Sequence, residues 1–251
     1  MRFQSRLGAT GQLKCLGEFW QQENADPKGS ICPAFFGIEA LYCVGEFKSG
    51  RDRILCVRWV DYPMLSDFSD HFPPRPNRVH EVCGPNAFGF AFALAGHLRG
   101  SVLWVREAWQ ADQINPAGFS PYVDPHSLLI AKGNDQTEVL ATAEEALRSG
   151  AVALTVIELT KPIGLTAGRR LQLAAEAGQS MGLCIVPEGT GSNAVETRWH
   201  CTSVFDPKDS TLQRWELIKN KSGTLTAWDV RWNVEARRII VVSEARERPV
   251  P

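Results

Sequence analysis

Short β-type runs alternate with helical runs from Arg78 to about Ser243, and no other feature of the sequence constrains the fold as strongly. The strands expected in the first part are Arg78–Cys83, Ser101–Val105, Ser127–Ala131, Ala151–Ile157 and Gly182–Val186; the helices expected between them are Phe88–Leu98, a segment from Asp135 to Gly150, and Thr166–Ala177. Strands that alternate with helices are joined by right-handed crossovers, and such crossovers build a mostly parallel sheet. The sequence therefore predicts an α/β fold.

The last third of this stretch has a different pattern. Thr211–Lys219 and Thr224–Trp232 lie on either side of a turn at residues 220–223, and Arg238–Val242 adds a third run. Runs of this length around short turns are typical of antiparallel strands, so we expect an antiparallel extension of the sheet. Its tryptophans are expected to be core residues and not a platform for stacking nucleic-acid bases. The tryptophans concerned are Trp199, Trp215, Trp228 and Trp232.

The composition excludes several classes of protein. Hydrophobic residues make up 44% and charged residues 22%, and the net charge is −1, which fits a globular protein and neither a disordered nor a collagen-like chain. Proteins that hold nucleic acid by bulk charge are strongly basic, so this balance argues against that mode. The 7 cysteines form no C-x-x-C pair, and His80, His97 and His126 lack ligand spacing, so no metal site is expected. The sequence has no apolar run of membrane-spanning length and no secretory signal, so we expect a cytoplasmic protein without membrane contact.

A glycine loop follows the first predicted strand and opens the first predicted helix. Its residues are Gly84, Pro85, Asn86, Ala87, Phe88, Gly89, Phe90 and Ala91. A phosphate-binding P-loop in this context reads G-x-x-x-x-G-K-[ST], so both glycines have the right spacing. Phe90 stands where a lysine would contact the phosphates, and Ala91 stands where a hydroxyl would hold Mg²⁺. The segment is therefore either an ordinary strand-to-helix turn or a vestigial nucleotide loop, and we expect neither ATP nor Mg²⁺ to bind.

Several segments resemble RecA recombinases in sequence and order. They are Asn77–Pro85, Asp124–Ile130, Glu138–Glu158 and Ile218–Lys221. The resemblance implies a RecA-like P-loop NTPase fold. It places Glu158 at the Walker B acid and Glu107 near the glutamate that activates the attacking water. It also places Lys219 and Lys221 at the lysines that reach the nucleotide of a neighbouring protomer.

The chain is also similar to the RecA-like family of inducible-mutagenesis protein A (ImuA). The matching phrases are VLWVRE (102–107), EEALRSGAVAL (144–154), LTAGRRLQLAAEAG (165–178) and TRW (197–199). The similarity covers residues 54–243, the predicted core domain; residues 1–53 match poorly, and residues 244–251 are expected to be a flexible tail. The resemblance implies an SOS-induced accessory factor of mutagenic translesion DNA synthesis. Its implied partners are a Y-family-polymerase-like mutagenesis protein and an error-prone replicative-type polymerase, with RecA as a further candidate.

Two departures from RecA concern DNA and nucleotide binding. The loops that hold single-stranded DNA in RecA correspond to Leu159–Leu165 and Pro187–Glu196, which are short, and the second contains no Lys or Arg. Pro187 and Glu188 replace the residue that senses the γ-phosphate. DNA binding is therefore expected to be weak or indirect.

The remaining charged candidates also have ordinary interpretations. Glu107 and Glu158 are expected at strand ends, where acidic residues cap helices or face solvent, so we regard them as vestigial acidic positions without a catalytic role. Lys219 and Lys221 flank a turn, where lysines are commonly solvated; contact with a partner protein is the alternative.

Three functions stay open at this level. The first is a non-catalytic adaptor that bridges or recruits error-prone polymerases, and the loop residues Phe90 and Ala91 favour it. The second is a DNA-stimulated ATPase or recombinase-like enzyme that uses Glu107 and the two lysines. The third is a weak single-stranded DNA-binding module at residues 208–248, where nine Lys and Arg stand against six Asp and Glu.

Overall fold

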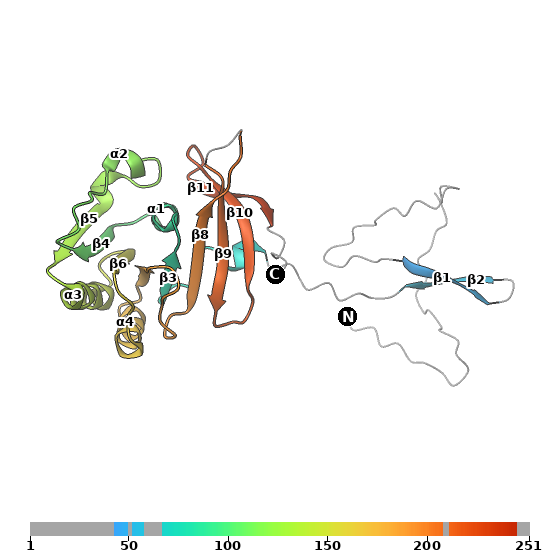
Figure 1. Ribbon diagram of the computed structural model, residues 1–251, viewed down its shortest axis with the longest axis horizontal. Coiled ribbons are helices and arrows are strands. Elements are labelled where there is room, and N and C mark those ends of the chain that lie inside the picture. The colour runs from blue at the N-terminus through green and yellow to red at the C-terminus, as the bar shows by residue number, and fades with distance from the viewer. Residues whose placement is uncertain (1–42, 50–51, 58–66, 208–210, 245–251) are drawn as a thin grey trace. The chain divides into compact units, whose positions relative to one another are not determined.

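The computed structural model describes residues 43–49, 52–57, 67–207 and 211–244, and the chain divides into two units, Met1–Met64 and Leu65–Pro251 (Figure 1). In the first unit, strand β1 (Cys43–Ser49) pairs with strand β2 (Asp52–Val57) as an antiparallel hairpin. The predicted boundary between residues 53 and 54 falls inside β2, whose pairing with β1 continues past it. Residues 1–42 and the predicted tail beyond residue 244 lie outside the described residues.

A nine-stranded sheet forms the second unit, in the order β11-β10-β9-β8-β3-β7-β6-β4-β5 (Figure 1). The strands are β3 (Val79–Cys83), β4 (Val102–Glu107), β5 (Leu128–Gly133), β6 (Leu154–Glu158), β7 (Met181–Ile185), β8 (Thr197–Ser203), β9 (Gln213–Asn220), β10 (Thr226–Asn233) and β11 (Arg238–Glu244). In this sheet order, the neighbouring strands β8, β3, β7, β6, β4 and β5 run parallel to one another. The neighbouring strands β8, β9, β10 and β11 pair antiparallel. This confirms the predicted α/β sheet with its antiparallel extension.

Helices cover both faces of the parallel part. Helix α1 (Ala87–Leu98) lies on one face, and α3 (Gln136–Ser149) and α4 (Leu165–Ala177) lie on the other (Figure 1). Three short helical pieces complete the unit, namely η1 (Phe68–Asp70), α2 (Pro116–Phe119) and η2 (Pro125–Ser127). Because helices cover both faces, strands β3, β6 and β7 are buried along their whole length.

The ends of α3 follow from its sequence. The Asp135 side chain accepts a hydrogen bond from the Glu138 amide at 2.9 Å, and Gly150 ends the helix with φ 64°. The Glu138 carboxylate accepts from the Asn134 amide at 2.8 Å, one residue earlier than in a standard capping box. The predicted helix is therefore confirmed, with a shifted reciprocal bond.

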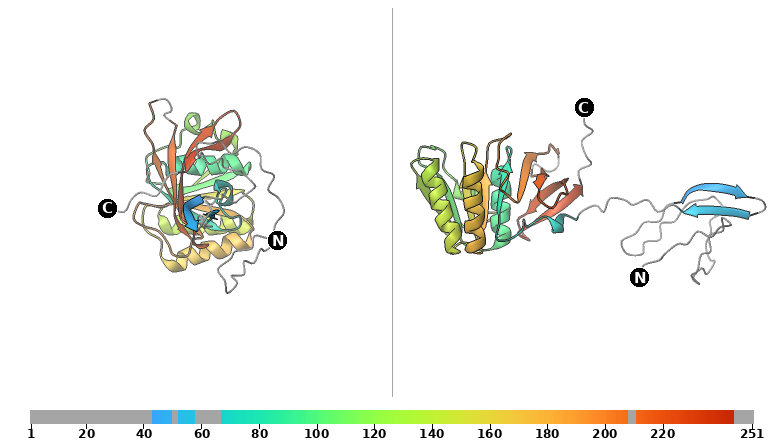
Figure 2. Two further views of the ribbon diagram at one scale, coloured as in Figure 1. Left: turned by 90° about the vertical axis from the view of Figure 1, so that its right-hand side faces the viewer. Right: turned by 90° about the horizontal axis from the view of Figure 1, so that it is seen from below.

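An aromatic core lies between α1 and the antiparallel strands, which extend from the end of the sheet opposite α3 (Figure 2). The predicted core tryptophans are all buried in it: Trp199, Trp215, Trp228 and Trp232. Phe68 and Phe72, which precede β3, pack against Trp215 with ring centroids 6.2 and 5.3 Å away. The interpretation of these tryptophans as core residues is confirmed.

Among the described residues, none of the helices combines the length and apolar character that a bilayer crossing requires.

Candidate functional site

The glycine segment forms a tight turn between β3 and α1. Gly84 has φ 95°, and a Cβ at this position would collide with the carbonyl oxygen of Cys201 on β8. The amide of Asn86 donates to the same oxygen at 3.0 Å, and the amide of Ala87 donates to the Gly84 carbonyl at 3.1 Å. Since α1 begins at Ala87, the predicted loop residues from Ala87 to Ala91 are helical, and only Gly84, Pro85 and Asn86 connect the strand to the helix.

Phe90 turns into the aromatic core, away from solvent. Its side chain is fully buried, and its ring centroid lies 4.6 Å from Trp215, 5.3 Å from Trp199 and 5.8 Å from Phe72. Ala91 is fully buried as well. The two positions that carry the lysine and hydroxyl of a P-loop are therefore filled by packing residues.

Glu107 and Glu158 are both buried at the carboxyl ends of β4 and β6. The Glu158 carboxylate accepts from Arg106 Nη2 and from Trp104 Nε1, both at 3.0 Å. Glu107 accepts from the Thr160 hydroxyl at 2.6 Å. The expectation that these acids cap helices or face solvent is wrong, because both are buried: Glu158 pairs with the buried Arg106, and Glu107 binds Thr160.

Lys219 and Lys221 bind the backbone of the loop at residues 187–196. Lys219 Nζ donates to the carbonyl oxygens of Ser192, Asn193 and Val195 at 3.3, 3.1 and 2.8 Å. Lys221 Nζ donates to the Ala194 carbonyl at 2.9 Å. The expectation of solvated lysines is wrong for Lys219, which is half-buried and donates to three carbonyl oxygens, whereas Lys221 stays exposed; in this fold both hold a loop of their own chain.

The same loop is anchored by an ion pair in the middle of the sheet. Glu81 on β3 has no exposed surface, and its carboxylate accepts from Arg198 Nε at 2.6 Å and from the Ser192 amide at 2.8 Å. Arg198 Nη2 also donates to the Ser192 carbonyl at 3.1 Å. Gly191, with φ 135°, lies against the guanidinium, where a Cβ would collide with it. Together with the two lysines, this pair fixes the loop by its backbone.

His80 lies in the neighbouring position of β3 and is also fully buried. Its ring nitrogens lie 2.7 Å from the Thr197 hydroxyl and 2.8 Å from the Arg75 carbonyl oxygen. Burial lowers the pKa of His80 to about 4, because the charged ring would be desolvated. At neutral pH the ring is therefore neutral and serves as a structural hydrogen-bonding group.

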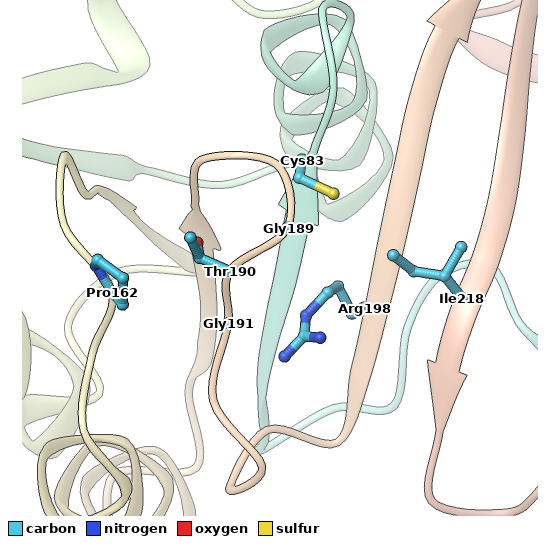
Figure 3. A pocket seen from close by; sticks show the side chains of 7 residues that line it. All are labelled: Cys83, Pro162, Gly189, Thr190, Gly191, Arg198 and Ile218. Atoms are coloured by element: carbon cyan, nitrogen blue, oxygen red, sulfur yellow. The ribbon is translucent and has the colours of Figure 1, made fainter.

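A cavity of about 390 Å³ opens between the end of β3 and the anchored loop (Figure 3). Its lining is formed by Cys83, Pro162, Gly189, Thr190, Gly191, Arg198 and Ile218. The Arg198 side chain extends from β8 toward the loop, and its charge is balanced by Glu81 (Figure 3). Burial raises the pKa of the Cys83 thiol to about 11, so this thiol is protonated at neutral pH. The cavity thus lacks the free positive charge that a phosphate requires.

Within the described residues, no cluster of three or more His, Cys, Asp or Glu side chains is arranged to hold a metal ion. The sequence reasoning missed Glu81, Arg198 and Arg106, the charged groups that organise this region. A signal for Glu81 exists in the sequence, since it is a charged residue in a short strand predicted to lie within the sheet, and a buried charge requires a partner. The partner itself lies more than a hundred positions away and could not be identified from spacing.

Comparisons with known proteins give one sequence relationship. No protein-family model matches the chain. The chain is 30% identical over 143 residues to Protein ImuA of Caulobacter vibrioides, in two strains, and the aligned part covers 55% of this chain and 55% of each relative. The chain thus spans about half the length of the curated relatives it matches. This similarity supports an ImuA-like family.

Among solved structures, SulA from Pseudomonas aeruginosa aligns with a TM-score of 0.35 and 19% identity, over 43% of this chain and 97% of that chain. A likeness of this size does not establish a common fold.

Proposed function

We propose that this chain is a non-catalytic accessory protein of SOS-induced mutagenic translesion DNA synthesis, built on a RecA-like scaffold. It bridges or recruits error-prone polymerases in the cytoplasm: a Y-family-polymerase-like mutagenesis protein and a replicative-type polymerase, with RecA as a further candidate partner. The similarity to Protein ImuA supports the pathway. The geometry of the turn after β3 supports the absence of catalysis.

One observation carries the proposal, namely the burial of Phe90 in the aromatic core. A P-loop holds phosphates with a lysine and with free backbone amides. Here the corresponding side chain is a fully buried phenylalanine, and the Asn86 amide already donates to the Cys201 carbonyl. Removing the charge-assisted bond from the lysine costs about 1.5–3 kcal/mol, or roughly 10–100-fold in affinity. The chain is therefore a pseudo-NTPase in this proposal.

The buried acids support the same conclusion for Mg²⁺. A divalent cation needs carboxylate oxygens that are free to coordinate it. Both oxygens of Glu158 accept hydrogen bonds, one of them from the Arg106 guanidinium. A cation at this position would also be repelled by that arginine, so no ATP–Mg²⁺ complex is expected there.

The anchored loop supports weak or indirect DNA binding. Residues 187–196 contain no Lys or Arg, and the nearby Lys219 and Lys221 are engaged by carbonyl oxygens of this loop. Phosphate contacts from basic side chains supply most of the affinity for nucleic acid. In this proposal the protein therefore reaches DNA through its partners.

A calorimetric titration of the full chain with ATP and Mg²⁺ tests the pseudo-NTPase part. We expect no heat of binding and no ATP hydrolysis with or without single-stranded DNA. Measurable hydrolysis would favour the DNA-stimulated ATPase and contradict this part. Salt-sensitive binding of single-stranded DNA at residues 208–248, removed by substitution of the lysines and arginines there, would favour the DNA-binding module.

Co-purification with the Y-family-polymerase-like partner tests the adaptor part. Exposed apolar residues on three different elements provide surfaces to change: Leu129 on β5, Leu173 on α4 and Val242 on β11. We expect substitution by aspartate at one of them to abolish co-purification without lowering the melting temperature, and the other two to serve as matched controls. Full binding by a fragment of residues 1–53 alone would show that the core does not do the bridging.

A further inference from the structure

A second cavity, of about 570 Å³, lies at the amino ends of the parallel strands, whereas the Gly84 turn lies at their carboxyl ends. Gly84 follows the carboxyl end of β3, whereas this cavity is formed at the amino ends of β4 and β5, by the end of α1 and by the turn between β10 and β11. Its lining consists of Ala95, Gly96, Arg99, Gly100, Ser101, Tyr122, Val123, Asp124, Ser127 and Arg237. The volume is in the range of small-ligand sites.

Two arginines from distant segments line this cavity, and both have left-handed backbone conformations. Arg99 ends α1 with φ 51°, and Arg237 in the β10–β11 turn has φ 46°. Glycine or asparagine is the usual residue in such positions, because a side chain with a Cβ is strained there. Non-glycine residues in strained conformations concentrate at binding sites. The positive charge of Arg99 is favourable at the carboxyl end of α1, which gives a structural reason for an arginine there. This reason does not apply to Arg237, which is not at a helix end.

Arg99 and Arg237 are both exposed, and neither guanidinium has a partner within the described residues. Seven other described arginines have a carboxylate within ion-pair distance: Arg75, Arg78, Arg106, Arg148, Arg170, Arg198 and Arg214. The acid that lines the cavity, Asp124, accepts from the His126 amide at 2.9 Å and belongs to the cap of η2. The cavity therefore has two arginines and one engaged carboxylate, and it is net positive.

The floor of the cavity is apolar, and its hydroxyl groups are free to bind. Ala95 and Val123 are buried, and Tyr122 stacks on Trp232 with ring centroids 5.0 Å apart. The side chains of Ser101 and Tyr122 make no hydrogen bond within the part of the chain that the structure describes. A guanidinium binds a carboxylate through two parallel hydrogen bonds, and an adjacent apolar floor accommodates an aliphatic group.

We propose that this cavity is a binding site for a carboxylate ligand, an acidic side chain next to an aliphatic one in a peptide segment, held between Arg99 and Arg237. Two arginines in a concave site with an apolar floor fit one carboxylate better than the repeated phosphates of a nucleic acid, which require a row of basic residues. The site does not depend on the proposed adaptor function, because it lies apart from the Gly84 turn and the anchored loop.

Calorimetric titration of the full chain with a blocked Leu-Glu-Leu tripeptide tests the proposal, with the matching Leu-Gln-Leu peptide as the neutral control. We expect the acidic peptide to bind and the neutral one not to bind. Arg99→Gln and Arg237→Gln should each weaken binding about 10-fold or more, as loss of a charge-assisted bond does. Arg169→Gln, which removes an exposed arginine of α4 outside the cavity, should leave binding unchanged.

The strained backbone adds a readout that a purely structural role would not give. Arg99→Gly and Arg237→Gly should weaken peptide binding as much as the glutamine variants do, without lowering the melting temperature, because glycine adopts the left-handed conformation without strain. Equal binding of the neutral peptide, unchanged binding by the glutamine variants, or displacement of the peptide by an equal concentration of inorganic phosphate would each overturn the proposal. So would loss of binding that occurs only together with a lowered melting temperature.

Discussion

The aromatic rings of Phe90 and Trp215 lie 4.6 Å apart, centroid to centroid, at an angle of 59°. This contact joins the first turns of α1 to the antiparallel strand β9 across 125 positions of the sequence. Aromatic pairs at this distance stabilise a core beyond the apolar area that they bury. The position at which a P-loop carries its phosphate-binding lysine is therefore one of the packing centres of this protein.

Replacing Phe90 by alanine tests this structural role. Removal of a buried phenylalanine ring costs about 3–5 kcal/mol of unfolding free energy, because the lost contacts and the cavity both destabilise the core. Urea denaturation would measure the change. The matched control is Phe88→Ala in the same helix, whose ring is 39% exposed and should cost clearly less. Equal losses for the two variants would show that Phe90 is not a packing centre.

Removing Arg198 tests the buried ion pair. Arg198→Met leaves the carboxylate of Glu81 in the interior without its counter-charge, and we expect a loss of about 3–5 kcal/mol. The double variant Glu81→Gln with Arg198→Met should recover much of this loss, since neither charge is then buried alone. Guanidinium-chloride unfolding of the three proteins measures both effects. A double variant as unstable as Arg198→Met would contradict the pairing.

Lys219 is expected to control the mobility of the anchored loop. Lys219→Met keeps the aliphatic stem but removes the donor to three carbonyl oxygens, at a cost of about 1.5–3 kcal/mol. Amide hydrogen exchange across residues 190–196 should become faster, while exchange in α3 stays the same. Lys161→Met, at an exposed position, is the control and should change neither. Unchanged exchange in the loop would mean that the lysine does not restrain it.

His80 predicts a stability loss in mild acid. Its pKa is about 4 in the folded protein against 6.5 ordinarily, so below pH 6.5 the unfolded chain takes up a proton that the folded chain does not. Stability should fall as the pH drops from 6.5 to about 4 and then level off, by about 3 kcal/mol in total from this residue. Unfolding free energies measured at several pH values would show this slope.

His80→Gln removes the titrating group and serves as the control for this measurement. The variant should be less stable near pH 7, where it loses hydrogen bonds to Thr197 and Arg75, yet its stability should depend less on pH between 6.5 and 4. Identical pH slopes for the two proteins would contradict the assignment to His80.

The sequence alone predicted the α/β architecture of the second unit and the ends of α3, but not strand β8, which joins the parallel and antiparallel parts of the sheet. Alternation of short apolar runs with helical runs is a local pattern, and crossover handedness turns it into a mostly parallel sheet. The Asp135 and Gly150 signals are equally local, because a cap bonds to residues within a few positions. For the same reason the antiparallel strands from β9 to β11 could be predicted from their spacing.

Only the tertiary structure decided what the candidate residues do. Phe90 packs on Trp215, Lys219 binds the loop at residues 192–195, and Arg99 and Arg237 line the same cavity, although the residues of each pair are far apart in sequence. Spacing indicates which residues share a strand or helix, but not which faces of distant elements pack together. Burial and charge pairing arise from that packing. Because of them, the side chains of Phe90 and Ala91, in a segment whose sequence resembles a nucleotide loop, belong to the core.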